Sequence, residues 1–168
     1  MATQDVLIRP TIEEDWREVR AIRLEMIADT PIAYLDTLQT AERQTERDWR
    51  RIAARNDETS LSLAAIRPDG TWVGRMGAYV PRRAIGAMLV GVYIAPTSRG
   101  RGAGVFDAML ERVEDWARAR GSVLTLEVNE FNPRARAAYE RRGFVLTGVT
   151  SPYPLDPPSL ELEMMKRL

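Results

Sequence analysis

The chain of 168 residues is long enough for one domain with an extensive hydrophobic core. Its 24 basic and 24 acidic residues balance, which argues against a protein that coats duplex nucleic acid, because such a protein needs a cationic excess. The chain contains neither cysteine nor histidine, which excludes disulfides, thiolate metal sites, cysteine nucleophiles, histidine bases and Ser-His-Asp triads. Any catalysis must therefore rely on carboxylates, hydroxyls, cations, backbone amides or an organic cofactor.

The sequence shows no targeting or membrane-spanning pattern. Residues 1–10 lack the basic segment followed by an apolar one that a secretory signal would have. The longest apolar run, Ile85 to Pro96, is well short of the roughly 20 residues that span a bilayer. We therefore expect a cytoplasmic protein that does not associate with membranes.

The first predicted element is a short strand over residues 6–9. Thr11 and Glu14 then form a capping-box pattern, in which each side chain would bond the other residue's backbone amide. This box opens a helix with apolar residues at helical spacing, and the helix ends near Thr30. A second helix is predicted over about residues 40–55.

The pattern then changes from helical to strand periodicity. Strands over residues 61–66 and 72–80 are joined by Arg67-Pro68-Asp69-Gly70, a sequence suited to a tight turn. Residues 88–95 are apolar on both faces, which predicts a buried central strand. A glycine-rich loop follows and leads into a third helix, which Gly121 is expected to end in a left-handed conformation.

The last third of the chain continues with a strand over residues 123–128. Asn132-Pro133 opens a fourth helix and Gly143 closes it, before a strand over 144–149. Residues 151–158 contain four prolines and are expected to be irregular, because proline cannot donate a backbone hydrogen bond. A final strand follows at 160–164. This order predicts a single α+β domain, residues 6–168, with a mixed sheet and helices on both faces.

The glycine-rich loop over residues 99–104 is a candidate anion site. It connects a buried strand to a helix, so free amides and the helix dipole would both attract a negative charge. Gly102 and Gly104 leave room for a phosphate, and Arg99 and Arg101 could add charge-assisted hydrogen bonds. A plain strand-to-helix turn with exposed arginines is the alternative. The loop lacks the Gly-Lys-Ser/Thr of a Walker loop and the spacing of a dinucleotide fingerprint.

Two motifs resemble those of a known family. Val92-Tyr93-Ile94-Ala95-Pro96, followed by Arg99-x-x-Gly102-x-Gly104, resembles motif A of the GNAT superfamily of N-acetyltransferases. Leu126-x-Val128-x-x-x-Asn132-x-x-Ala135-x-x-x-Tyr139-x-x-x-Gly143-Phe144 resembles its motif B, with Ala138 where many members carry leucine. The order of the predicted elements also matches this family from the first strand to the last.

The resemblance implies a three-layer, seven-stranded, mostly antiparallel sheet that splays between strands four and five. Acetyl-CoA would lie in the splay, with no metal. Its pantetheine arm would pair with backbone groups of Val92 and Ile94, as in β-augmentation. Asn132 would bond the same arm or act only as a helix cap. The pyrophosphate would lie on the amides of Arg99, Gly100, Arg101, Gly102, Ala103 and Gly104.

The resemblance also implies a catalytic role for Tyr139, which shares one helix face with Asn132. A phenol is protonated at neutral pH and could protonate the departing thiolate, although Tyr139 could also be a core aromatic. A backbone amide around residues 92–94 would stabilise the oxyanion. No general base is assigned, since Glu127 and Glu130 are both expected to be structural or solvated.

We therefore expect an acetyl-CoA-dependent N-acetyltransferase that acts on a primary amine by direct attack in a ternary complex. The acceptor would be a small-molecule amine or a peptide, in a pocket lined by residues such as Met26, Asp29, Tyr34, Tyr79 and Tyr153. Asp29 could pair with a cationic acceptor or simply end its helix. Alternatives are an acyltransferase for a protein N-terminus or lysine, and a catalytically weak CoA-binding sensor. We expect no nucleic-acid partner, and a homodimer is plausible.

Overall fold

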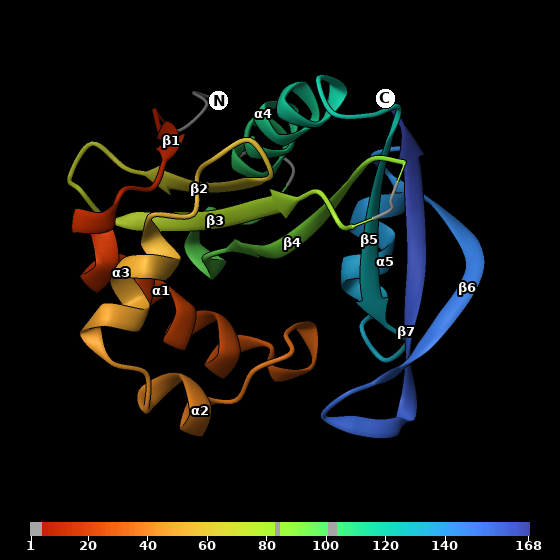
Figure 1. The fold of residues 1–168 in the computed structure, drawn as a ribbon, viewed down its shortest axis with the longest axis horizontal. Coiled ribbons are helices and arrows are strands. Elements are labelled where there is room, and N and C mark those ends of the chain that lie inside the picture. The colour runs from red at the N-terminus through yellow and green to blue at the C-terminus, as the bar shows by residue number, and fades with distance from the viewer. Residues whose placement is uncertain (1–4, 83–84, 101–103) are drawn as a thin grey trace.

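A computed structural model describes residues 5–82, 85–100 and 104–168 (Figure 1). Seven strands form one sheet in the order β1-β2-β3-β4-β5-β7-β6. The strands are β1 (Leu7–Pro10), β2 (Ser60–Ile66), β3 (Trp72–Tyr79), β4 (Ala87–Ile94), β5 (Val123–Asn129), β6 (Val145–Tyr153) and β7 (Asp156–Arg167). Of the neighbouring pairs, β4 and β5 run parallel and the others antiparallel. The predicted mixed, mostly antiparallel α+β fold is confirmed.

The helices lie on both faces of the sheet. They are α1 (Trp16–Asp29), α2 (Leu38–Glu42), α3 (Glu46–Ala53), α4 (Val105–Arg118) and α5 (Pro133–Glu140), with short 3₁₀ turns η1 (Glu13–Asp15), η2 (Pro31–Ala33) and η3 (Pro96–Ser98). Figure 1 shows β2, β3 and β4 between α4 above and α1 to α3 below.

Successive residues of β3 face these two helical layers in turn. A Cβ added to Gly74 would lie 2.9 Å from the Met109 sulfur of α4, so Gly74 faces α4. The next residue, Arg75, pairs with Tyr93, whose hydroxyl donates to Glu25 of α1 at 2.7 Å. Because side chains alternate along a strand, each layer of helices covers one half of the β3 and β4 side chains.

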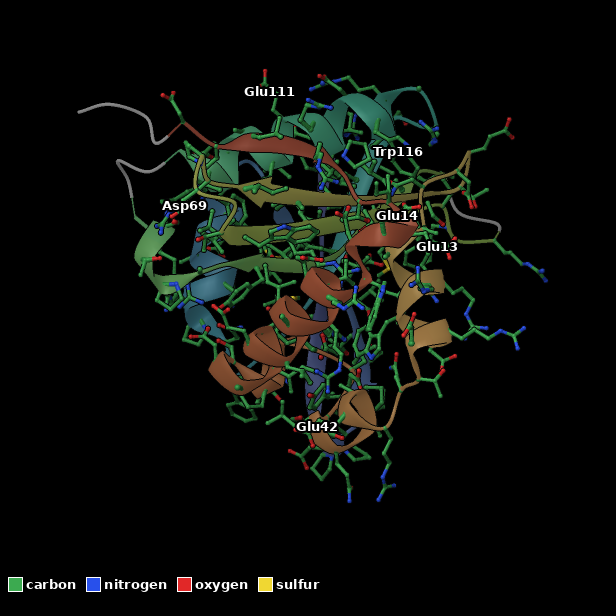
Figure 2. All side chains as sticks on the ribbon, turned by 90° about the vertical axis from the view of Figure 1, so that its left-hand side faces the viewer. Glu13, Glu14, Glu42, Asp69, Glu111 and Trp116 are labelled. Carbon is green, nitrogen blue, oxygen red and sulfur yellow. The ribbon has the colours of Figure 1, made fainter. Side chains whose placement is uncertain are left out.

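The start of α1 differs from the predicted capping box. The Thr11 hydroxyl donates to the Ala53 carbonyl at 2.7 Å, so it caps no helix amide. The Asp15 carboxylate instead accepts from the Ile12 amide at 2.9 Å. Glu14 is exposed beside Glu13 (Figure 2). The Thr11–Glu14 box was wrong because Thr11 is buried against the end of α3, where its hydroxyl finds another acceptor.

The helix predicted over residues 40–55 is two helices, α2 and α3. Thr45 is the N-cap of α3. Its hydroxyl accepts from the Asp48 amide at 3.3 Å, and the Asp48 carboxylate accepts from the Thr45 amide at 3.0 Å. This reciprocal capping box begins a new helix. The apolar residues Trp49 and Ile52 fall at the predicted spacing on α3, but helical periodicity did not reveal the break before them.

The proline-rich segment 151–158 is more regular than predicted. Strand β6 continues to Tyr153 and β7 begins at Asp156, with Pro152 paired opposite Leu160. The prolines are tolerated because β6 is an edge strand and because β5 pairs with β7 only from Glu161 onward, so few ladder donors are needed here. The prediction of an irregular segment was therefore wrong.

Two glycines bring β4 and β5 together at one end. Gly121 does not have the positive φ of a helix C′ residue, contrary to the prediction. Instead, a Cβ there would lie 2.4 Å from the Ile85 carbonyl oxygen, and a Cβ on Gly86 would lie 2.2 Å from that of Val123. In the described residues the two strands pair only at Ala87–Leu124 and Met88–Thr125. Beyond these pairs they separate, which confirms the expected splay.

Candidate active site

The space between the separated strands is a cavity of about 380 Å³. Residues from η2, β4, the loop before α4, the first turn of α4, β5 and α5 line it. The predicted site residues that the structure describes all lie on its wall: Val92, Ile94, Arg99, Gly100, Gly104, Asn132 and Tyr139. Arg101, Gly102 and Ala103 lie outside the described residues. Sequence positions spread over 48 residues, from 92 to 139, thus meet at one cavity.

The β4 backbone on one wall is shaped by a bulge. The register of β3 and β4 shifts between Arg75 and Gly77, where Gly91 adopts a φ of +58°. Beyond the bulge, the Ala95 amide donates to the Val73 carbonyl at 2.8 Å. Because alternate residues of an antiparallel strand bond the same neighbour, Val92 and Ile94 turn their main-chain groups away from β3 and toward the cavity.

Side chains already occupy the two carbonyls at this edge. The Tyr34 hydroxyl donates to the Val92 carbonyl at 2.9 Å, and Arg99 Nε donates to the Ile94 carbonyl at 2.6 Å. The amides of Val92 and Ile94 are the remaining polar groups on this stretch. The edge of β4 therefore offers hydrogen-bond donors to the cavity, which suits carbonyl groups or a developing oxyanion.

Two glycines on either side of residues 101–103 have positive φ angles. Gly100 has a φ of +112° and Gly104, the N-cap of α4, a φ of +65°. No atom of the described residues lies within 4 Å of the position that a Cβ on Gly100 would take. Since the first amides of a helix have no intrahelical partner, this end of the cavity is suited to an anion.

Arg99 and Asp29 are engaged with each other. The Arg99 guanidinium donates to both Asp29 carboxylate oxygens, at 2.5 and 3.4 Å, and lies 5.4 Å from the Tyr93 ring centroid. The hydrogen bond from Arg99 is the main cause of the lowered pKa of Asp29. The side chain of Arg99 thus ties the loop to the end of α1, and Asp29 has no free carboxylate for a cationic acceptor.

Tyr139 lies on the opposite wall, on α5. It is 9% exposed, and its ring packs against Phe106 and Phe144 with centroid distances of 6.1 and 5.8 Å. Its hydroxyl forms no hydrogen bond with the residues that the structure describes. Burial raises the pKa of this phenol, so the proton stays on at neutral pH. The ring is fixed by packing while its proton is available to whatever enters the cavity.

Asn132 caps α5, since its side-chain oxygen accepts from the Ala135 amide at 3.2 Å. The same side chain lines the cavity, so the cap and a contact to a ligand are compatible. Of the five residues suggested for an acceptor pocket, Tyr34 lines the cavity. Met26 is instead fully buried in the core, and Tyr79 lies at the far end of β3, where it contacts Met88.

The sequence analysis did not identify the arginines on α5 and directly after it as site residues. Arg134 and Arg141 line the cavity, are exposed, and form no hydrogen bond or ion pair within the described residues. Arg142 also lines it but is held by Asp107, at 2.6 and 3.2 Å. The many arginines after Asn132 were a visible signal, but only the folded helix separates those that face the cavity from Arg136, which pairs with Glu140.

The two acidic residues considered as bases behave differently. Glu130 is structural, because its carboxylate accepts from the Leu160 amide at 2.8 Å. Glu127 lines the cavity and has no hydrogen-bond or ion-pair partner among the described residues. Of the two, Glu127 is therefore the one that lies at the cavity without an established structural role.

Within the described ranges, no three His, Cys, Asp or Glu side chains are grouped as a metal site would require. None of the helices in this part of the chain combines the length and hydrophobicity needed to cross a bilayer.

Comparison with known proteins gives consistent matches. Residues 21–144 match the model of a family described as Acetyltransferase (GNAT) family. The chain is 32% identical over 131 residues to a protein of Azospirillum brasilense named IAA acetyltransferase, covering 77% of this chain and 82% of that protein. A GCN5-related N-acetyltransferase from Kribbella flavida superposes with a TM-score of 0.75 at 23% identity, over 99% of this chain and 100% of the other. The protein yncA from Salmonella typhimurium, solved with its cofactor acetyl-CoA, superposes with a TM-score of 0.74 at 18% identity, over 98% and 94%.

Proposed function

The chain belongs to the acetyltransferase (GNAT) family, and from this premise we propose that it transfers the acetyl group of acetyl-CoA to a primary amine by direct attack in a ternary complex. The observation that carries the proposal is the cavity between β4 and β5, with outward β4 amides on one wall and the free hydroxyl of Tyr139 on the other. Acyl transfer from a thioester is helped by a donor to the oxyanion and by an acid that protonates the departing sulfur.

The residues on the cavity wall fit acetyl-CoA. The amides of Val92 and Ile94 suit the carbonyl groups of a pantetheine arm, and the glycine-lined start of α4 suits its diphosphate. The unpaired cations Arg134 and Arg141 suit its remaining negative charge. That yncA was solved with acetyl-CoA in the same fold supports this assignment. When bound, acetyl-CoA would supply an activated acetyl group.

The chain's own residues would then perform two tasks. An amide of β4 would hold the negative charge that develops on the acetyl oxygen, in a position fixed by the Gly91 bulge and by the bond from Tyr34 to Val92. Tyr139 would hold a proton at its hydroxyl and give it to the departing sulfur. Its raised pKa keeps this donor protonated across the neutral range. Neither task requires histidine or a metal.

The substrate is proposed as a small-molecule amine or a peptide, reaching the acetyl group from the α1 and η2 side of the sheet. A CoA-binding sensor without turnover is the competing function. The free hydroxyl of Tyr139 favours the enzyme, because it offers a proton donor at the cavity wall that acyl transfer can use.

Two measurements test the proposal. Acetyl-CoA at about 100 times its Kd should stabilise the protein by roughly 2.7 kcal/mol in thermal melting, whereas ATP with magnesium should not. Purified protein with acetyl-CoA and a panel of primary amines should release free thiol. An unchanged melting temperature in acetyl-CoA would refute the assignment, and stabilisation without thiol release on any amine would favour the sensor.

A further inference from the structure

One largely buried glutamate beside the cavity has no partner. Glu161 of β7 is 7% exposed, yet it forms no hydrogen bond or ion pair with the residues that the structure describes. Its carboxylate oxygens are accessible to solvent, so the charged end of Glu161 reaches open space while the rest of the side chain is covered. A carboxylate held in this way can accept hydrogen bonds from a cationic ligand. Glu127 of β5, which lines the cavity, is likewise without a partner in the described chain.

The strand register places these two carboxylates together. Asn129 pairs with Glu161 and Glu127 pairs with Glu163, so all four side chains project from one face of β5 and β7. Glu127 and Glu161 are diagonal neighbours on that face, a separation that long side chains bridge. Both Glu127 and Asn129 line the cavity, and Glu161 lies one strand behind them.

The segment η2 closes over this face. The Tyr153 hydroxyl, at the end of β6, donates to the Tyr34 carbonyl at 2.8 Å, and Tyr34 itself lines the cavity. The pKa of Tyr153 is raised by burial and then by the charge of Glu161, which places Glu161 close to it. Glu161 therefore lies between the β5 face and the side from which an acceptor would enter.

Five other acidic residues in this region have carboxylates that accept hydrogen bonds, unlike Glu127 and Glu161. Their partners are Tyr93 for Glu25, Arg99 for Asp29, Arg142 for Asp107, the Leu160 amide for Glu130 and Thr147 for Glu163.

Burial and the negative charge of Glu127, in that order, raise the pKa of Glu161. The titratable groups placed near it are Glu127 from β5, Tyr153 from β6 and Glu163 from its own strand. Within the described residues no cation is paired with it. A carboxylate whose pKa lies nearer neutrality is a better proton acceptor at the pH of the cell.

On the proposed function, we infer that the acceptor is a strongly basic, cationic primary amine and that Glu161, together with Glu127, binds its ammonium group and takes its first proton. The resulting neutral amine forms a bond to the acetyl carbon as the carbon–sulfur bond breaks. The second proton lost by nitrogen replaces the one that Tyr139 gives to sulfur. The products are an amide, a thiol and one proton, which Glu161 returns to solvent.

The test compares Glu161→Gln with Glu163→Gln, a matched variant on the same face whose carboxylate is engaged by Thr147. Thiol release is measured with a basic alkylamine and with a weakly basic arylamine that is already neutral at pH 7. Glu161→Gln should lower kcat/KM for the alkylamine by about 10²-fold and remove the acidic limb of its pH profile. The arylamine should be affected little, and Glu163→Gln should change neither.

Thermal melting provides the folding control, because Glu161→Gln removes a negative charge that lies near that of Glu127 and should not lower the melting temperature. Glu127→Gln is the second variant and should show the same selectivity for the alkylamine. Equal losses on both amines, or an unchanged pH profile, would overturn the role of Glu161 while leaving the transferase intact. Stabilisation by acetyl-CoA with no thiol release on any amine would instead refute the proposed function, and this inference with it.

Discussion

Replacing Tyr139 with phenylalanine should separate chemistry from stability. The hydroxyl bonds none of the described residues, and the Phe106 and Phe144 contacts are made by the ring, which phenylalanine retains. No hydrogen bond is lost, so the free energy of unfolding should change by less than about 0.5 kcal/mol, against roughly 1 kcal/mol for a typical bond. Loss of the proton donor should lower kcat by about 10²-fold or more.

Tyr34→Phe is the matched control on the same cavity. It deletes the hydrogen bond of 2.9 Å that the Tyr34 hydroxyl donates and leaves the Val92 carbonyl without that donor. Its cost should be about 1 kcal/mol in unfolding free energy. For a chain of this size that is a fall of roughly 2–4 °C in Tm. The two variants should therefore differ in both kcat and stability. Tyr139→Phe should lose most of its kcat and keep its stability, whereas Tyr34→Phe should be less stable but retain a higher kcat.

The assay pairs thermal melting with thiol release at saturating acetyl-CoA and amine, from pH 6 to 9. Because burial raises the pKa of Tyr139, the wild-type enzyme should show no alkaline loss of kcat from this group in that range. Full kcat in Tyr139→Phe would refute the proton-donor role. A drop in Tm matching that of Tyr34→Phe would show that the Tyr139 hydroxyl is bonded within the protein, contrary to the reasoning.

Three further predictions concern other parts of the fold. Arg134→Ala should weaken acetyl-CoA binding in a salt-dependent manner, measured by calorimetry, whereas Arg136→Ala should not, because that cation is already paired with Glu140. Gly121→Ala should lower the unfolding free energy by about 1–3 kcal/mol in urea titration, since the added carbon meets backbone; an unchanged midpoint would contradict the close approach. Asp15→Asn should cost about 1–2 kcal/mol at pH 7 by losing two bonds from Arg9, at 2.6 and 2.8 Å. Because these bonds lower the pKa of Asp15, that difference should shrink as the pH falls below the ordinary value of 3.8, and a constant difference would oppose this account.

Local patterns predicted most of the elements because they reflect local causes. The two-sided apolar run at 88–95, the Asn132-Pro133 start and the positive φ of Gly143 all follow from the residues themselves. The predictions failed where a distant contact changed the outcome. The Thr11 hydroxyl donates to a carbonyl of α3 instead of capping α1. The prolines of residues 151–158 fit into strands because β6 is at the edge of the sheet, which only the assembled sheet defines.

The features of the cavity also differ in whether local sequence or distant contacts decide them. Motif spacing by itself predicted that residues 92–94, Asn132 and Tyr139 meet, and in the structure they line one cavity. Only the tertiary structure decided which charges are free: it pairs Arg99 with Asp29 and leaves Glu161 without a partner. Spacing along one strand or helix fixes which side chains share a face of that element. The pairing of charges depends instead on which segments the folded chain brings within a few ångströms of each other.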